Sequence, residues 1–137
     1  MALQFSGYAA IFDAPDLRGD IIYRGAFAQS LMAGRTAPML WQHDPGQPCG
    51  KWLDVREDET GLWVHGEVAV SARAEAQALR AGRINGLSIG FRTRAADPRP
   101  GGGRFLRGID LWEISLVTFP MHPRARLILS ALAEEVA

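Results

Sequence analysis

Turn-forming residues divide this chain into short segments. Fifteen glycines and eight prolines make up about 17% of its 137 residues, against a usual share of about 12%. Because glycine and proline interrupt regular secondary structure, the segments between them are mostly short and strand-like. We therefore expect a mainly β protein of the α+β class.

Seven segments have the character of β-strands. In one of them Leu62, Val64 and Val68 alternate with Trp63 and Glu67, which is the two-residue period of a half-buried strand. The predicted strands are residues 3–12, 19–23, 37–43, 49–56, 62–70, 84–94 and 105–119. Residues 45–48 are expected to form a loop, and so are the glycine-rich residues 97–103.

Three segments favour helices. Phe27 and Leu31 lie four residues apart, on one face of the first. Ser71 stands where the N-cap of the second belongs, and Gly82 supplies its stop. The third is amphipathic and closes the chain. The predicted helices are residues 25–34, 72–81 and 124–136.

These elements suggest how the chain is organised. A length of 137 residues suits one domain, spanning residues 1–137. A hydrophobic share of 47% is enough for a core. We therefore expect a single-domain closed β-barrel of about seven strands with a few helices packed outside it.

Charge and cysteine content narrow the function classes. Fifteen basic and fifteen acidic side chains cancel, whereas a nucleic-acid-binding domain normally carries a basic surplus. Cys49 is the only cysteine, so no intramolecular disulfide forms. No apolar run approaches the ~20 residues that cross a bilayer, and the N-terminus lacks the features of a signal peptide. We expect a soluble protein of a reducing, cytoplasmic compartment that binds neither nucleic acid nor membrane.

Ser88 is the first candidate for chemistry. Gly86, Ser88 and Gly90 share one face of a predicted strand, and the residues between them are apolar. Glycine inside a strand often marks a close approach of another backbone, and a protease substrate makes such an approach to its nucleophile. An alternative of equal weight is that the glycines relieve a tight barrel bend and Ser88 is an ordinary surface hydroxyl.

Glu113 is the second candidate. Trp112, Ile114 and Leu116 form the apolar face of a predicted strand, with Glu113 and Ser115 on the opposite face. Apolar neighbours on both sides shield the Glu113 carboxylate from water, so it needs a partner. A salt bridge to one of the arginines is the alternative to a role in a site.

His43 is the third candidate, at the end of a predicted strand. Histidine is the side chain best suited to pass protons near neutral pH, although a single histidine is more often structural. The adjacent Asp44 is expected to point elsewhere. His65 and His122 complete the histidines, and no two have the spacing of a metal motif, so we expect no metal site. No phosphate loop or dinucleotide fingerprint is present, so no cofactor is expected either.

Five stretches of the sequence carry a resemblance to a known family. They are residues 7–13, 19–27, 40–44, 79–82 together with 86–91, and 111–120. In this order and spacing the chain resembles the prohead serine proteases, the capsid-maturation enzymes of tailed phages and distant relatives of the herpesvirus assemblins. Gene transfer agents, which are phage-like particles encoded on bacterial chromosomes, use similar proteases. The resemblance implies a herpesvirus-protease-like fold, with His43 as base, Ser88 as nucleophile and Glu113 as the third triad member. In the herpesvirus relatives a second histidine takes that third place.

The resemblance also implies a function. The chain would be a serine endopeptidase that cleaves segments of the major capsid or scaffolding protein, and itself, inside a procapsid assembling in the bacterial cytoplasm. Backbone N–H groups, Arg124 or Arg126 would stabilise the oxyanion, and the protein would form a homodimer or higher homo-oligomer. Three alternatives stay open: an inactive homologue acting as a scaffold or assembly factor, an unrelated β-barrel binding module, and a hydrolase of non-peptide esters.

Overall fold

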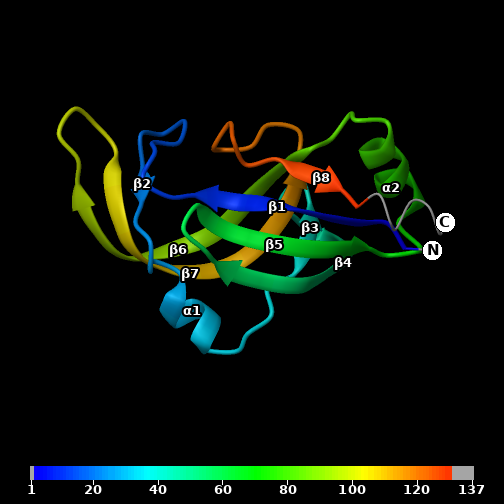
Figure 1. Cartoon of the computed structure of the whole chain (residues 1–137), viewed down its shortest axis with the longest axis horizontal. Helices are drawn as coiled ribbons and strands as arrows, with labels where there is room; N and C mark the ends of the chain where they lie inside the picture. Colours follow the sequence, from blue (N-terminus) through cyan, green and yellow to red (C-terminus); the bar gives the residue numbers. More distant parts are fainter. Residues whose placement is uncertain (1, 131–137) are drawn as a thin grey trace.

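The structure is a computed structural model that describes residues 2–130 (Figure 1). It contains one eight-stranded sheet and two short helices. The elements in chain order are β1 (Gln4–Ile11), β2 (Ile21–Ile22), α1 (Ala28–Met32), β3 (Met39–Trp41), β4 (Asp44–Glu57), β5 (Gly61–Val68), α2 (Arg73–Arg80), β6 (Gly86–Pro98), β7 (Arg104–Val117) and β8 (Leu127–Leu129). Each of the seven predicted strands overlaps an observed one, and β8 is the strand the sequence did not predict.

Strand β7 organises the sheet. Strand β6 pairs antiparallel with β7 along its whole length, while β2 and β3 pair parallel with β7 at separate positions. The sheet continues from β3 through β4, β5 and β1 to β8. Beyond β3, strands β6 and β7 continue together as a ribbon on the left of Figure 1, where β2 pairs with the start of β7. The ribbon therefore carries residues of β6 well beyond the point where β3 leaves β7.

The prediction of a closed barrel is wrong, because the sheet does not close. Closure would need a continuous ladder between β6 and the end of the sheet at β8. Instead, the segment before β8 meets β6 through one isolated bridge between Gly86 and Arg126. Two hydrogen bonds flank it, from Leu87 N–H to the Ala125 carbonyl and from Leu127 N–H to the Asn85 carbonyl. Beyond these residues β6 follows β7 alone.

The alternation in β5 predicts its burial correctly. Leu62, Val64 and Val68 are at most 1% exposed, and burying each stabilises the fold by about 1.5–3 kcal/mol. Gly66 lies on the same face of β5. A Cβ there would come within 2.7 Å of the Met39 and Trp52 side chains. The core is therefore packed closely enough to require glycine at this position.

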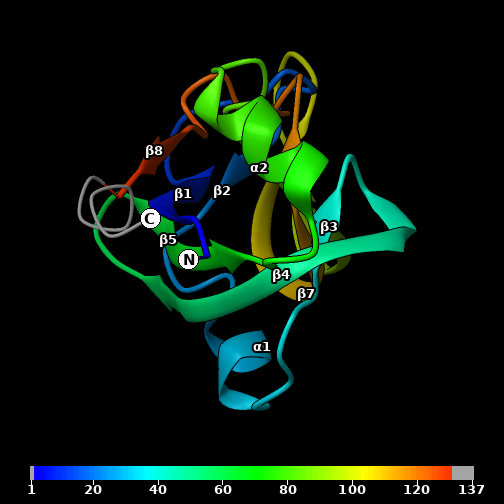
Figure 2. The same cartoon turned by 90° about the vertical axis from the view of Figure 1, so that its right-hand side faces the viewer.

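The two helices lie on opposite sides of the sheet (Figures 1 and 2). Helix α2 fits the prediction for residues 72–81, and Gly82 follows it with a φ of 74°. The N-cap prediction is wrong, because Ala72 occupies that position without a side-chain hydrogen bond. The predicted helix 124–136 is also wrong where it is described. Its residues 127–129 pair with β1 as β8, and residues 131–137 lie outside the described part of the chain.

Candidate active site

A two-residue turn fixes the backbone of His43. Trp41 pairs with Asp44 across β3 and β4, leaving Gln42 and His43 as the turn, with φ values of 54° and 63°. Positive φ at both central positions is the mark of a type I′ hairpin turn, and residues other than glycine adopt it rarely. The turn projects from the body on the right of Figure 2. The loop predicted at 45–48 is wrong, because this tight turn lets β4 begin at Asp44.

Gln42 ties the turn to the end of β7. Its backbone N–H donates to the Leu116 carbonyl over 2.9 Å. Its side-chain amide donates to Thr118 Oγ1 over 2.7 Å and accepts from Thr118 N–H over 3.1 Å. Such hydrogen bonds hold a strained turn in one conformation.

His43 pairs with Glu113. The imidazole Nδ1 lies 2.5 Å from Glu113 Oε2, and the side chains are 42% and 14% exposed. Ser115 Oγ donates to Glu113 Oε1 over 2.7 Å and accepts from His43 N–H over 3.1 Å. The partner of Glu113 among the described residues is thus a histidine rather than an arginine. Asp44 points elsewhere as predicted, accepting from Gly46 N–H.

A β-bulge precedes Glu113 on β7. Gly90 pairs with Glu113 and Phe91 with Leu111, so Trp112 has no partner on β6. Trp112 is 53% exposed, and the prediction that it shares the apolar face of Ile114 is wrong. The alternation of side chains breaks at a bulge, which redirects the residues beside it.

Two side chains from the α1 region hold the bulge in place. Leu111 N–H donates to Ser30 Oγ over 2.9 Å, and the Leu111 carbonyl accepts from the Arg35 guanidinium over 2.8 Å. These bonds satisfy backbone groups that the bulge would otherwise leave unpaired.

The glycines beside Ser88 make room for neighbouring parts of the protein. A Cβ at Gly90 would lie 2.5 Å from Glu113 Oε2, and a Cβ at Gly86 would lie 2.8 Å from both Pro120 Cδ and the Val117 carbonyl. The absence of a side chain at Gly90 therefore leaves the space that the Glu113 carboxylate occupies. The barrel-bend alternative is wrong because there is no barrel, and Ser88 is 6% exposed rather than a surface hydroxyl.

One cavity of about 520 Å³ connects Ser88 with distant parts of the chain. Its residues include one group that we call the histidine–serine end, made of His43, Ser88 and Gly90. They also include a second group that we call the arginine end, made of Asp16, Arg18, Asp20, Thr93 and Arg104. Ser88 and Thr93 are five residues apart on β6, about 16 Å at ~3.3 Å per residue.

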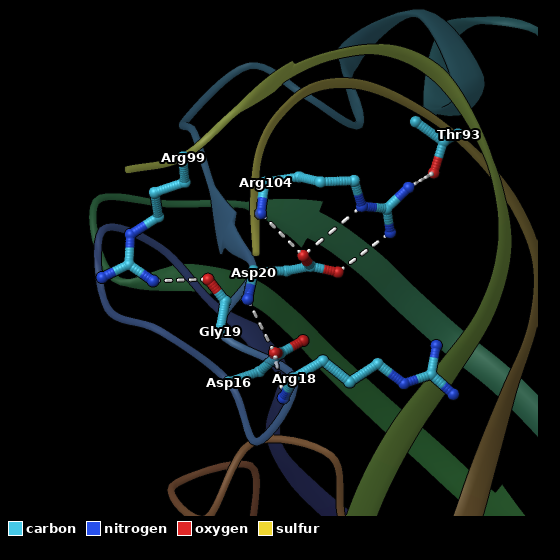
Figure 3. A network of polar contacts seen from close by, with 7 residues as sticks. All are labelled: Asp16, Arg18, Gly19, Asp20, Thr93, Arg99 and Arg104. Carbon is cyan, nitrogen blue, oxygen red and sulfur yellow. Dashed lines mark hydrogen bonds and ion pairs between the residues drawn. The ribbon is translucent and has the colours of Figure 1, made fainter. Parts of the chain in front are cut away.

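An ion pair between the buried Asp20 and the partly exposed Arg104 forms the arginine end (Figure 3). Asp20 is 5% exposed, and its Oδ2 accepts from Arg104 Nη2 over 2.9 Å while its Oδ1 accepts from Arg104 N–H over 2.9 Å. These bonds from Arg104 hold the pKa of the Asp20 carboxyl below its usual value. Arg104 Nη1 also donates to Thr93 Oγ1 on β6. No periodicity in the sequence links these positions, which lie 84 residues apart.

His122 forms part of the cavity wall, which the sequence did not suggest. It is 9% exposed, its Nδ1 accepts from Arg124 N–H, and its Nε2 has no hydrogen-bond partner among the described residues. Burial lowers its pKa. Arg124 and Arg126 are not among the residues found to line the cavity. The Arg126 guanidinium donates to Asn85 Oδ1 and the Pro123 carbonyl.

The remaining titratable candidates lie elsewhere. His65 bonds to the Gln4 side chain, and burial raises the pKa of the Cys49 thiol to about 12. Within residues 2–130 no three His, Cys, Asp or Glu side chains gather as a metal site. Over the same residues no helix has the length and apolar character needed to span a membrane.

Known proteins match this chain over nearly its full length. Residues 1–136 match the family described as Caudovirus prohead serine protease. The chain belongs to that family. It is 37% identical to the prohead protease of Enterobacteria phage HK97 over 131 residues, covering 88% of this chain and 57% of the relative. It is 29% identical to the prohead protease of Escherichia phage T5 over 112 residues, covering 78% of this chain and 53% of the relative. The chain thus spans little more than half of these two curated relatives.

Solved structures share the fold of this family member. The capsid assembly protease of bacteriophage T4 superposes with a TM-score of 0.70 at 14% identity, over 85% of this chain and 81% of that one. The KSHV protease, solved with a hexapeptide phosphonate inhibitor, gives 0.63 at 14% identity over 99% of this chain and 68% of that one. The prediction of a herpesvirus-protease-like, mainly β fold is therefore confirmed, apart from barrel closure. The origin in a gene transfer agent stays a prediction.

Proposed function

We propose that this protein is a serine endopeptidase in which Ser88 attacks the peptide carbonyl. The observation that carries the proposal is the 2.5 Å contact between His43 Nδ1 and Glu113 Oε2, with His43 and Ser88 lining one cavity. A histidine oriented by a carboxylate beside a serine is the arrangement that activates a hydroxyl nucleophile.

His43 acts as the general base. With Glu113 ionised, the proton of the neutral imidazole sits on Nδ1, so Nε2 is free to accept one. Nε2 takes the Ser88 hydroxyl proton as Oγ bonds to the carbonyl carbon, and then gives that proton to the leaving amine. Water hydrolyses the acyl-enzyme by the same steps and restores Ser88.

Glu113 stabilises the imidazolium that forms during each proton transfer. Its Oε2 faces Nδ1, and its Oε1 is held by Ser115 Oγ. Because Ser115 also accepts the His43 N–H, base and carboxylate share one anchor. We propose Ser115 as a positioning residue that sequence reasoning placed on the right face without assigning it a role.

The names of the relatives support a proposal about the substrates. We propose that the chain cleaves segments of a capsid or scaffolding protein, and itself, within an assembling procapsid in the bacterial host. The support is that its relatives are named prohead proteases and that a structural neighbour is named a capsid assembly protease. The alternative of an inactive scaffold homologue is less favoured, because the histidine–carboxylate pair would be unnecessary in it.

Co-expression with the neighbouring capsid or scaffolding protein tests this function. Wild type should produce fragments by mass spectrometry, and Ser88→Ala should produce none. Identical fragments in both would remove Ser88 as the nucleophile. Assembled particles without cleavage in either would favour the scaffold alternative.

A further inference from the structure

The arginine end of the cavity contains a cation without a partner. The Arg18 guanidinium makes no hydrogen bond and no ion pair with the described residues, and Figure 3 shows it extending past Asp20 and Arg104. Arg18 lines the cavity. An arginine has five N–H donors in a planar fork that suits a carboxylate.

The neighbouring carboxylates are occupied by other groups. Asp20 accepts three bonds from Arg104. Asp16 Oδ1 accepts from Arg18 N–H over 2.8 Å and from Asp20 N–H over 3.0 Å, which fixes the loop that carries Arg18. The charge of Arg18 acts on Asp20 from a distance, adding to the effect of Arg104 in lowering its pKa. Neither acid neutralises Arg18 by direct contact.

The unused donors at this end favour an anion. The cavity lining here contains the guanidinium groups of Arg18 and Arg104 and the carboxylates of Asp16 and Asp20. The Arg104 guanidinium and the buried Asp20 carboxylate are already bonded to each other. An added carboxylate would therefore meet the unused N–H donors of Arg18.

We propose that the arginine end binds an acidic side chain of the substrate peptide through Arg18. This deepens the proposed function and rests on it. The arginine end lies about 16 Å along β6 from Ser88, at ~3.3 Å per residue of extended chain. The acidic residue therefore lies within about five residues of the cleaved bond, on one side of it.

A cleavage-site survey tests the proposal. Wild type and Arg18→Gln are incubated with peptides from a digested bacterial proteome, and the cut sites are read by mass spectrometry. Wild type should enrich Glu or Asp at one fixed position, and Arg18→Gln should reduce that enrichment about tenfold. Arg24→Gln, an exposed arginine outside the cavity lining, is the matched control and should keep the preference. No acidic preference, or one unchanged in Arg18→Gln, would overturn the proposal.

A binding selection separates this proposal from the protease function. Ser88→Ala protein, with and without Arg18→Gln, is immobilised and used to select from a random decapeptide library. Acidic peptides should be enriched only when Arg18 is present. If wild type cleaves nothing but this enrichment appears, recognition by Arg18 holds and the protease function fails. Enrichment of Lys or Arg would assign recognition to Asp16 and overturn the proposal.

Discussion

The two ends of the cavity are built in different ways. At the histidine–serine end, irregular backbone places the side chains: His43 sits in a turn with positive φ, and Glu113 follows a bulge. At the arginine end, a buried carboxylate, Asp20, is bonded to the partly exposed Arg104, and neither residue has a positive φ. The difference indicates that strain is concentrated where a side chain must be aimed, while the arginine end is stabilised by charge pairing. Changes at the first end should therefore affect catalysis, and changes at the second should affect stability and recognition.

Glu113→Gln should have the largest effect. The amide can still fill the space, but it cannot stabilise the imidazolium or hold the productive tautomer. We expect kcat to fall by roughly 10³–10⁴-fold, with the melting temperature nearly unchanged. Peptide hydrolysis and calorimetry measure the two quantities.

Glu59→Gln is the control for that change. Glu59 is exposed in the turn between β4 and β5, so its substitution should alter neither activity nor stability. An equal loss of activity in both variants would contradict the role of Glu113.

Gly90→Ala should disturb the histidine–serine end sterically. The added Cβ would meet Glu113 Oε2 at 2.5 Å, so the carboxylate must move away from His43. Misplacement of a catalytic group by about 1 Å costs roughly 10²-fold, and we expect a loss of that order in kcat/KM. Gly108→Ala on β7 meets its nearest atom at 3.4 Å and should retain activity. Full activity of Gly90→Ala would show that the Glu113 position is not critical.

The side chains of the histidine–serine end could be predicted from the sequence, but the backbone that positions them could not. Alternation placed Ser88 between two glycines and Glu113 on the face of Ser115, and the family resemblance joined both to His43. The turn at Gln42–His43 escaped prediction because this pair is not one of the Asn-Gly or Asp-Gly pairs that signal a two-residue hairpin turn. The bulge at Trp112 escaped because a period of two continues through it in the sequence.

Long-range pairing limited the rest of the prediction. The seven main strands can be predicted from the local sequence pattern. Strand β8 forms only because residues 127–129 pair with the edge of β1. The same sequence reads as an amphipathic helix when considered alone. Asp20 and Arg104 are likewise brought together by the pairing of β2 with β7, which no local signal specifies.

Asp20→Asn should act mainly on stability. Removing one partner of this pair leaves Arg104 without its carboxylate, and we expect a loss of about 2 kcal/mol in the free energy of unfolding. Because the pKa of Asp20 is lowered in the fold, its contribution is complete above the unfolded pKa of about 4 and is lost as the pH falls through the folded value. Urea unfolding at pH 7 and at pH 3 should show the difference from wild type shrinking at the lower pH.

Asp97→Asn provides the surface counterpart. Asp97 pairs with Arg107, and both side chains are about half exposed, so the loss should stay within about 0.5 kcal/mol. A loss at Asp97 as large as that at Asp20 would remove the contrast between the two pairs.

Thr118→Val should have the smallest effect. It removes the hydroxyl that accepts from Gln42 while Thr118 N–H can still donate, so the turn loses one anchor. One neutral hydrogen bond is worth about 1 kcal/mol, and we expect kcat/KM to fall about fivefold. Thr36→Val, at an exposed position, should leave kcat/KM unchanged. If Thr118→Val matched Thr36→Val, the turn would not need this bond.

Labelling with a peptidyl phosphonate tests most directly whether His43 activates Ser88. Such a reagent bonds to an activated serine oxygen and adds a defined mass. We expect one adduct per chain, mapped to Ser88 by peptide sequencing, absent in Ser88→Ala and formed far more slowly in His43→Ala. An adduct on another residue, or one formed at the wild-type rate in His43→Ala, would contradict it.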